Sequence, residues 1–210
     1  MWYDMQQPTI IENADTSAIA SWIKTRLVAA LGAGDGPISI TIPGGSTPFP
    51  ILEELARSNL DWQRIIVWPG DDRIVPEDHA ASNTGRIRAA LEPVGAKVVA
   101  LGTMEQVPHF ALAWLGMGAD GHIASLFPNT DPQVDDTQKI RRLTPDPLPP
   151  EAPFDRITLT IPALLDSDAL MFVIRGDDKR AVFDAAAAGQ NTLPVARLLG
   201  AAEQSVTCFV

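Results

Sequence analysis

Apolar residues recur along the chain with two alternating spacings, one typical of helices and one typical of strands. In residues 15–31 they fall three and four positions apart, which predicts an amphipathic helix capped by Asp15 or Thr16. The same spacing predicts further helices at 49–57, through Ile87 and Leu91, at 162–166, at 178–188 with Asp177 as cap, and at 194–199. Short apolar runs predict strands at 38–42, 65–68, 97–101, 110–115, 156–161, 169–174 and 205–210.

This alternation predicts an α/β fold: a doubly wound, mostly parallel sheet with helices on both faces, in a Rossmann-like three-layer α/β/α arrangement. We expect a single domain over residues 1–210, with 205–210 as an edge strand. Two connections depart from the pattern. Residues 102–109 are too few for a crossover helix, and 129–153 is a long proline-rich connecting segment rather than a helix. Ligands of such sheets bind where the strands end, so the segments that follow the strands are candidates for chemistry.

Charge and cysteine content narrow the classes of partner. The net charge is −10 with 16 Lys and Arg, which argues against nucleic acid or an anionic membrane as the main partner. An anionic small substrate would need a local cationic pocket. Cys208 is the single cysteine, which excludes intrachain disulfides and a cysteine-based metal site. Residues 1–16 lack a secretion-signal pattern and no apolar run has membrane-spanning length, so we expect a cytoplasmic protein.

Residues 44–48, Gly-Gly-Ser-Thr-Pro, follow a predicted strand and open the next helix. Glycine permits close backbone approach and free N–H groups at a helix start favour an anion, so Gly44, Gly45, Ser46 and Thr47 form a candidate anion site. Pro48 suits the first turn of the helix. The alternative is a tight Gly-Gly turn in which Thr47 is only a helix cap. A serine-hydrolase elbow is excluded because Pro48 stands where that pattern needs glycine.

Charged residues follow two further predicted strands. Asp71, Asp72 and Arg73 can bind a metal, orient a sugar hydroxyl or grip a phosphate, although a solvated turn is the alternative. A metal site is disfavoured because no two of the three histidines have ligand spacing. Lys179 lies in the first turn of a predicted helix, where its charge opposes the helix dipole. It therefore either holds an anion or simply faces solvent.

The segment 116–122, Gly-Met-Gly-Ala-Asp-Gly-His, ends an apolar run and holds the candidate reactive group, His122. Its glycines match the G-x-G-x-x-G spacing of dinucleotide-binding folds, so an NAD-dependent oxidoreductase is one alternative. That fingerprint opens a long helix, whereas here Pro128 follows seven residues after the last glycine. In addition, no acidic residue ends a following strand at the expected distance.

Three motifs together carry a resemblance to a known family. They are Gly44–Pro48, then Asp71–Arg73 with Val75-Pro76 and Ser82-Asn83, then Gly116–His122 with Ala124–Pro128. In this order, and over roughly Ile38 to Val195, the chain closely resembles the 6-phosphogluconolactonases, which share their fold with the glucosamine-6-phosphate deaminase/isomerases. The Ser-Leu-Phe-Pro at 125–128 favours the lactonase branch, because the deaminase branch typically carries Asn-Glu-Pro after its Asp-Gly-His motif.

The resemblance implies hydrolysis of a phosphorylated sugar lactone, 6-phospho-glucono-lactone, in the oxidative pentose phosphate route. It implies that His122 is the general base that activates water against the lactone carbonyl, and that Asp120 fixes the loop that positions it. Arg73 and Lys179 would grip the phosphate. The implied substrate-binding residues are Gly44, Gly45, Ser46, Thr47, Asp71, Arg73, Gly118 and Lys179. No metal or redox cofactor is required, and we expect a monomer or a weak homodimer.

The chemistry is also consistent with the residues alone. An imidazole with a pKa of about 6.5 suits a base near neutral pH, and glycine-rich backbone can offer donors to an oxyanion. A phosphate remote from the reacting carbon supplies binding energy that orients the ring. Two alternatives stay open. One is isomerisation and deamination of an amino-sugar phosphate, with Asp71 as the carbon-proton base, and the other is a catalytically inactive sugar-phosphate sensor.

The chain departs from the family pattern at two places. The family has a longer segment, with a helix, between the third and fourth predicted strands, and an aspartate near the start of the fourth where this chain has His109-Phe110. The usual Asp-Glu-Arg reads Asp-Asp-Arg at 71–73. We expect the trimmed segment to affect stability and one wall of the cleft, and the shorter acid to affect hydroxyl recognition.

Overall fold

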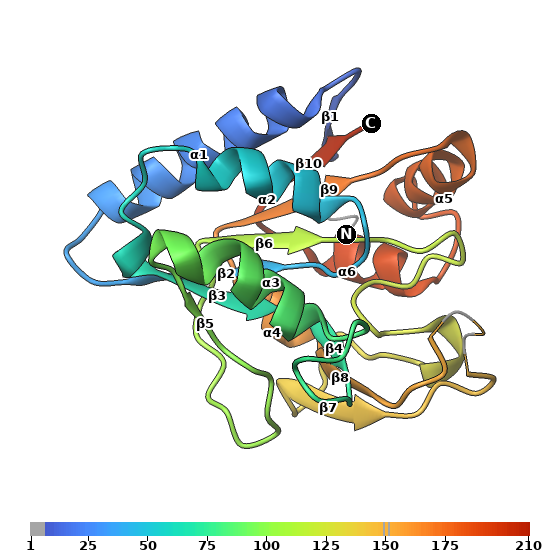
Figure 1. Cartoon of the computed structure of the whole chain (residues 1–210). Coiled ribbons are helices and arrows are strands. Elements are labelled where there is room, and N and C mark those ends of the chain that lie inside the picture. The colour runs from blue at the N-terminus through green and yellow to red at the C-terminus, as the bar shows by residue number, and fades with distance from the viewer. Residues whose placement is uncertain (1–6, 149, 151) are drawn as a thin grey trace.

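Figure 1 shows the computed structural model, which describes residues 7–148, 150 and 152–210. Among these residues, seven strands form a central sheet in the order β1-β10-β9-β6-β2-β3-β5, and all of its pairs are parallel. From edge to edge the strands are β1 (Thr9–Ile11), β10 (Ser205–Phe209), β9 (Ala169–Val173), β6 (Leu112–Leu115), β2 (Ile38–Ile42), β3 (Ile65–Pro69) and β5 (Lys97–Val98). The predicted doubly wound α/β fold is confirmed.

Helices cover both faces of this sheet, because its inner strands carry apolar side chains on both sides. In β9, Ala169, Met171 and Val173 belong to one core, and Leu170 and Phe172 belong to the other. The first core is closed by α1 (Thr16–Gly32), α2 (Pro48–Ala56) and α3 (Asn83–Leu91), and the second by α4 (Ile161–Leu165), α5 (Asp177–Ala187) and α6 (Pro194–Ala201). Short 3-10 turns lie at Trp62–Arg64, Glu92–Val94 and Pro128–Thr130.

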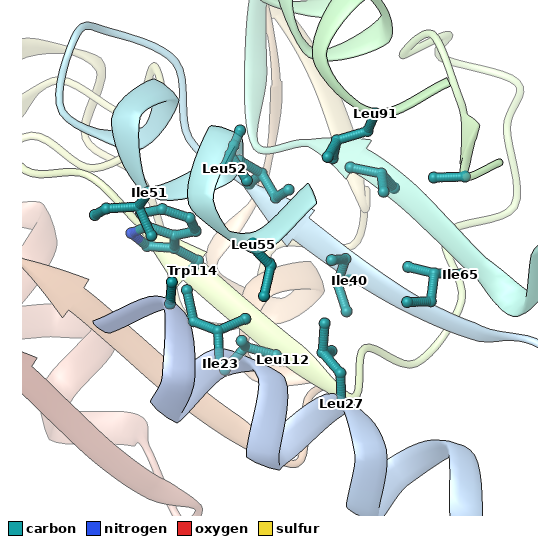
Figure 2. Packing of buried hydrophobic residues seen from close by; sticks show 14 of the residues in the cluster. Ile23, Leu27, Ile40, Ile51, Leu52, Leu55, Ile65, Leu91, Leu112 and Trp114 are labelled. Atoms are coloured by element: carbon teal, nitrogen blue, oxygen red, sulfur yellow. The ribbon is translucent and has the colours of Figure 1, made fainter. Parts of the chain in front are cut away.

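Figure 2 shows how the first core joins its layers. Ile23 and Leu27 of α1 and Leu55 of α2 belong to the same cluster as Ile40 of β2 and Leu112 of β6. Each of these five side chains is at most 2 % exposed. Burying such a side chain contributes roughly 1.5–3 kcal/mol, so the strands, and the loops that leave their carboxyl ends, are fixed firmly in space.

A second, smaller sheet is antiparallel and has the order β4-β8-β7. Its strands are β4 (Asp71–Arg73), β8 (Arg156–Leu159) and β7 (Ile140–Leu143). Gly70 alone separates β3 from β4, so one stretch of chain passes from the large sheet into the small one. The sequence pattern does not predict β4 or β7, since both are short and polar and become strands by pairing with β8.

Three predictions about individual elements are wrong. The 205–210 strand is not at an edge, because β10 lies between β9 and β1, and the three residues of β1 are too few to give a strand pattern. Asp177 is the first residue of α5 rather than its cap, and Gly176 holds the cap position with a φ of +93°. The strand predicted at 97–101 is shortened to Lys97–Val98.

Other local predictions are confirmed. Asp15 caps α1, since its carboxylate accepts the N–H of Ala18 at 2.7 Å. Residues 102–109 contain no helix, and the described part of 129–153 contains no α-helix. Within the described ranges, no helix has both the length and the apolar character needed to cross a membrane.

Candidate active site

A cavity of about 280 Å³ opens at the carboxyl ends of β2 and β6, beside β4 of the small sheet. The residues predicted to bind substrate all line it: Gly44, Gly45, Ser46, Thr47, Asp71, Arg73, Gly118 and Lys179. His122 lines it as well, whereas Asp120 does not line it but contacts the imidazole. The fold therefore brings four separate segments of the sequence to one edge of the sheet.

His122 is held by Asp120 within one tight loop. Its Nδ1 lies 2.6 Å from Asp120 Oδ1, and the same oxygen accepts the His122 backbone N–H at 3.2 Å. The side-chain hydrogen bond with His122 lowers the pKa of Asp120, so this carboxylate stays ionised near neutral pH. Nε2 of His122 makes no hydrogen bond with a described residue, and the side chain is 31 % exposed. An imidazole that is oriented at Nδ1 and free at Nε2 has the geometry of a general base.

Gly118 makes room for this pair. A Cβ at position 118 would lie 2.2 Å from Nδ1 and Cε1 of His122 and 2.6 Å from Asp120 Oδ1. The Gly118 N–H donates to the His122 carbonyl at 2.9 Å, and the Gly121 N–H donates to the Gly118 carbonyl at 3.0 Å, so the loop closes on itself. Just beyond it, Ala124 has a φ of +48°, a left-handed conformation that costs free energy in a non-glycine residue. Substrate contact by the Gly118 backbone stays a prediction, since its N–H already has an acceptor.

The 44–47 loop carries unpaired backbone donors along the cavity. No described residue accepts a hydrogen bond from the N–H of Gly45, Ser46 or Thr47. Gly45 has a φ of +88°, which favours glycine. Thr47 occupies the cap position of α2 without a side-chain cap bond, so it is not acting as a simple helix cap. Free N–H groups at the start of a helix favour a bound anion.

Successive side chains of β4 point to opposite sides. Asp71 and Arg73 line the cavity. Asp72 instead faces the start of α3, where its carboxylate accepts the N–H groups of Asn83 at 2.6 Å and Thr84 at 2.9 Å. Asp72 therefore stabilises the N-terminus of α3. The expectation that this shorter acid takes part in hydroxyl recognition is not supported by its position outside the cavity.

Asn83 connects the cavity wall to the 44–47 loop, a role that the sequence analysis missed. Nη1 of Arg73 donates to Asn83 Oδ1 at 2.9 Å and to the Ala81 carbonyl at 3.1 Å, and Asn83 Nδ2 donates to the Asp71 carbonyl at 2.9 Å. A Cβ on Gly44 would lie 2.2–2.3 Å from the Asn83 side chain, which explains the glycine. The motif Ser-Asn at 82–83 is visible in the sequence, but these contacts depend on how α3 packs against the loop.

Asp71 is buried in the cavity wall. Its Oδ2 accepts a hydrogen bond from the Ser125 hydroxyl, and the Ser125 N–H donates to Thr158 Oγ1 at 3.2 Å. Burial raises the pKa of Asp71, against the opposing effects of the Ser125 hydrogen bond and the charge of Arg73. A carboxyl group in this position can accept a hydrogen bond from a sugar hydroxyl, or donate one when it is protonated. Ser125, known from the sequence only as part of a motif, is what orients it.

Lys179 reaches the cavity from the first turn of α5. The ion pairs of this helix involve Arg180, with Glu12 at 3.8 Å and Asp184 at 2.7 Å. Lys179 has no carboxylate partner in the part of the chain that the structure describes, so its ammonium is available to an anion. Its place in the cavity wall favours anion binding over the interpretation as a purely solvent-facing lysine.

Two other kinds of site find little support in the geometry. Among residues 7–148, 150 and 152–210, no group of three or more His, Cys, Asp or Glu side chains could hold a metal ion. The described residues between His122 and Thr160 form no α-helix, whereas a dinucleotide fingerprint opens a long one. His79 is exposed in its loop and lies outside the cavity lining.

The chain matches the sequence model of a family described as glucosamine-6-phosphate isomerases/6-phosphogluconolactonase, over residues 12–100 and 90–208. It is 33 % identical over 226 residues to the 6-phosphogluconolactonase of Neisseria meningitidis, with 95 % of each chain covered. It is 35 % identical over 207 residues to the 6-phosphogluconolactonase of Pseudomonas aeruginosa, with 87 % of this chain and 86 % of that one covered.

Solved structures show the same likeness in three dimensions. The crystal structure of 6-phosphogluconolactonase from Thermotoga maritima superimposes with a TM-score of 0.82 and 26 % identity, covering 97 % of this chain and 99 % of that one. A 6-phosphogluconolactonase from Shewanella baltica gives a TM-score of 0.81 at 25 % identity, with 98 % of each chain covered. The similarity therefore spans nearly the whole chain rather than one motif.

Proposed function

The chain belongs to the glucosamine-6-phosphate isomerase/6-phosphogluconolactonase family, and we propose that it hydrolyses 6-phospho-D-glucono-1,5-lactone to 6-phospho-D-gluconate. One observation carries the proposal: His122 and the 44–47 loop line the same cavity, together with Arg73 and Lys179. A base and a cationic phosphate site around one small cavity are what hydrolysis of a phosphorylated lactone requires. The proposed setting is the oxidative pentose phosphate route in the cytoplasm.

In the proposed reaction, Nε2 of His122 takes a proton from a water molecule as that water attacks the lactone carbonyl carbon. A tetrahedral intermediate forms, with its negative charge on the former carbonyl oxygen. When it collapses, the bond from this carbon to the ring oxygen breaks, and the proton on Nε2 passes to the departing oxygen. The product is the open-chain acid. Asp120 supports both proton transfers, because a carboxylate at Nδ1 stabilises the transient imidazolium.

The phosphate group would hold the ring in place for this attack. The unpaired N–H groups of the 44–47 loop would donate to its oxygens, and Arg73 and Lys179 would add positive charge. Binding energy from such a remote group is used to orient the carbonyl relative to His122. Asp71, oriented by Ser125, would bind a ring hydroxyl.

An assay of the purified protein tests the proposal directly. It should release acid from 6-phospho-glucono-lactone well above the spontaneous rate, and a metal chelator should leave the rate unchanged. Ammonia release from glucosamine 6-phosphate without lactone hydrolysis would instead assign isomerase/deaminase chemistry, with Asp71 taking a proton from carbon. Sugar-phosphate binding that persists in His122→Ala, with no turnover in the parent protein, would indicate a sensor.

The phosphate site has its own test in Arg73→Gln. This change removes a cation from the cavity wall, so KM for the phosphorylated lactone should rise by about tenfold, with a smaller effect on kcat. The rate with unphosphorylated glucono-lactone should stay at the parent value, and Arg73→Lys should restore part of the affinity. Equal losses on both lactones would show that the change damages the cavity wall in general and would count against a phosphate contact.

A further inference from the structure

Two side chains of α3, one helical turn apart, lie against the two glycines of the 44–47 loop. The Asn83 side chain fills the space that a Cβ of Gly44 would need. Nη1 of Arg86 donates to the Gly45 carbonyl at 3.0 Å. Residues three positions apart share a helix face, so one face of α3 supports both glycines.

Arg86 is held by an aromatic ring rather than by a carboxylate. Its Cζ lies 3.8 Å from the centroid of the Phe49 ring in α2. Arg88 of the same helix pairs with Glu77 and Glu92, whereas Arg86 forms no ion pair with a described residue. Arg86 therefore places a positive charge without an ion-pair partner among the described residues beside the loop, on the side of the Gly45 carbonyl.

The hydrogen bond fixes the peptide unit between Gly45 and Ser46. This peptide is trans, and the carbonyl and N–H of a trans peptide point in opposite directions. A Gly45 carbonyl directed at Arg86 therefore directs the Ser46 N–H away from Arg86. Ser46 lines the cavity and its N–H has no acceptor among the described residues. A flip of this peptide would replace the N–H by a carbonyl oxygen, which repels an anion, and glycine at position 45 offers little resistance to such a flip.

We propose that Arg86 is a positioning residue for the phosphate site. It holds the 44–47 loop with its N–H groups available to the anion, and its charge adds to the attraction for that anion. Arg86 does not line the cavity, so it acts through the loop and through its field rather than by touching the ligand. The inference rests on the proposed function, in which this loop binds the phosphate of the substrate.

The test compares Arg86→Gln with Arg26→Gln. Arg26 is a matched control because its Cζ lies 4.8 Å from the Trp22 ring centroid, also in a cation–π contact, on a helix that does not line the cavity. Arg86→Gln should raise KM for the phosphorylated lactone about tenfold, with kcat and the rate on unphosphorylated glucono-lactone unchanged. Arg86→Lys keeps the charge and one donor, so it should recover part of the loss. Arg26→Gln should match the parent protein.

An unchanged KM in Arg86→Gln would overturn the inference. So would equal losses on both lactones, which would show that Arg86 has a general structural role. If Arg86→Gln does not fold, the KM of Arg86→Lys decides, with an increase expected and parent behaviour counting against the inference.

Binding of inorganic phosphate, measured by titration calorimetry, separates this inference from the proposed function. A parent protein that binds phosphate without hydrolysing the lactone, together with weaker binding in Arg86→Gln, would refute the function and keep the role of Arg86. Equal phosphate affinity in the parent and in Arg86→Gln would refute that role whatever the activity. Absence of phosphate binding by the parent would refute the phosphate site and with it the role of Arg86, while the lactone assay would still decide the proposed function.

Discussion

The chain carries two histidine–aspartate arrangements at opposite ends of β6, and they are built differently. His109 precedes the strand and is bonded at both ring nitrogens, with Nδ1 2.8 Å from Asp166 and Nε2 2.9 Å from Asp168. His122 follows the strand and is bonded to Asp120 at Nδ1, while Nε2 has no partner in the part of the chain that the structure describes. His122 also lines the cavity at the sheet edge, which His109 does not.

The number of engaged ring nitrogens decides what each histidine can do. The hydrogen bonds to Asp166 and Asp168 raise the pKa of His109, because they favour the imidazolium. With both ring nitrogens engaged by carboxylates, His109 has no free nitrogen to take a proton from water, and its contacts tie the segment before β6 to the turn that precedes β9. A carboxylate beside a histidine is therefore not by itself a sign of catalysis. A free ring nitrogen at a cavity is the feature that distinguishes His122.

The largest expected effect is a difference in kcat between variants of the two histidines. His122→Asn should lower kcat by about a hundredfold or more, because it removes the proposed general base, with little change in phosphate affinity. His109→Asn should keep the parent kcat. Steady-state kinetics on the phosphorylated lactone provide the measurement. Full turnover in His122→Asn would mean that the base has been assigned to the wrong residue.

Gly118→Ala tests whether the geometry of the His122–Asp120 pair matters, with both groups still present. The added Cβ would lie 2.2 Å from the imidazole ring, so the ring must move. A displacement of this kind should lower kcat by about tenfold to a hundredfold. Gly200→Ala, in a position where a Cβ meets no atom within 4 Å, is a matched control expected to behave like the parent. Parent-like kcat in Gly118→Ala would show that the pair tolerates displacement.

A smaller loss should follow from Asp120→Asn. The amide oxygen can still accept from Nδ1, but the negative charge that would stabilise the imidazolium of the proposed mechanism is gone. Because Asp120 is half exposed, we expect kcat to fall by about tenfold, which is less than the loss expected when a fully buried catalytic group is changed. Asp168→Asn makes the same chemical change beside the other histidine and should leave kcat unaffected. Equal effects of the two changes would remove the functional distinction between the pairs.

The smallest effect concerns stability, and it belongs to His109. Its folded-state pKa is raised, so its contribution is fully present below the unfolded-state pKa of about 6.5 and is lost as the pH rises through the folded-state value. The side chain is 54 % exposed, so solvent screening should keep this contribution below about 1 kcal/mol. Urea unfolding of the parent and of His109→Gln, at about pH 6 and about pH 9, should give a difference that shrinks at the higher pH. A difference in unfolding free energy that does not depend on pH would contradict the assignment of this contribution to the protonated His109.

Much of the fold follows from the sequence because the inner strands are strongly apolar. The 38–42 strand is observed with its predicted bounds as β2, since alternating isoleucines permit few other interpretations. The small sheet could not be predicted in this way. Its pairing joins Asp71 to Thr158, far apart in sequence, and no local pattern reports such a contact.

The site residues also divide into those that a local sequence pattern predicts and those that only the structure reveals. His122 and Asp120 lie two positions apart, so one local motif contains the whole pair. The supports of the 44–47 loop are different, because Asn83 and Arg86 reach its glycines only after α3 has packed against the loop. The sequence therefore identifies groups within one loop, while groups that act across two elements require the structure.

Because only Gly70 separates β3 from β4, one wall of the cavity belongs to the small sheet. That sheet has its own strand pairing and only three strands among the described residues. Hydrogen exchange should accordingly reveal two opening events, a frequent one that begins at β7, the edge strand of the small sheet with Arg141 and Arg142 exposed, and a rare one in the inner strands of the large sheet. Ligand affinity would then follow the frequent event. The proposed sugar-phosphate ligand should therefore bind more weakly in mild denaturant, while most of the slowest-exchanging amides are still protected.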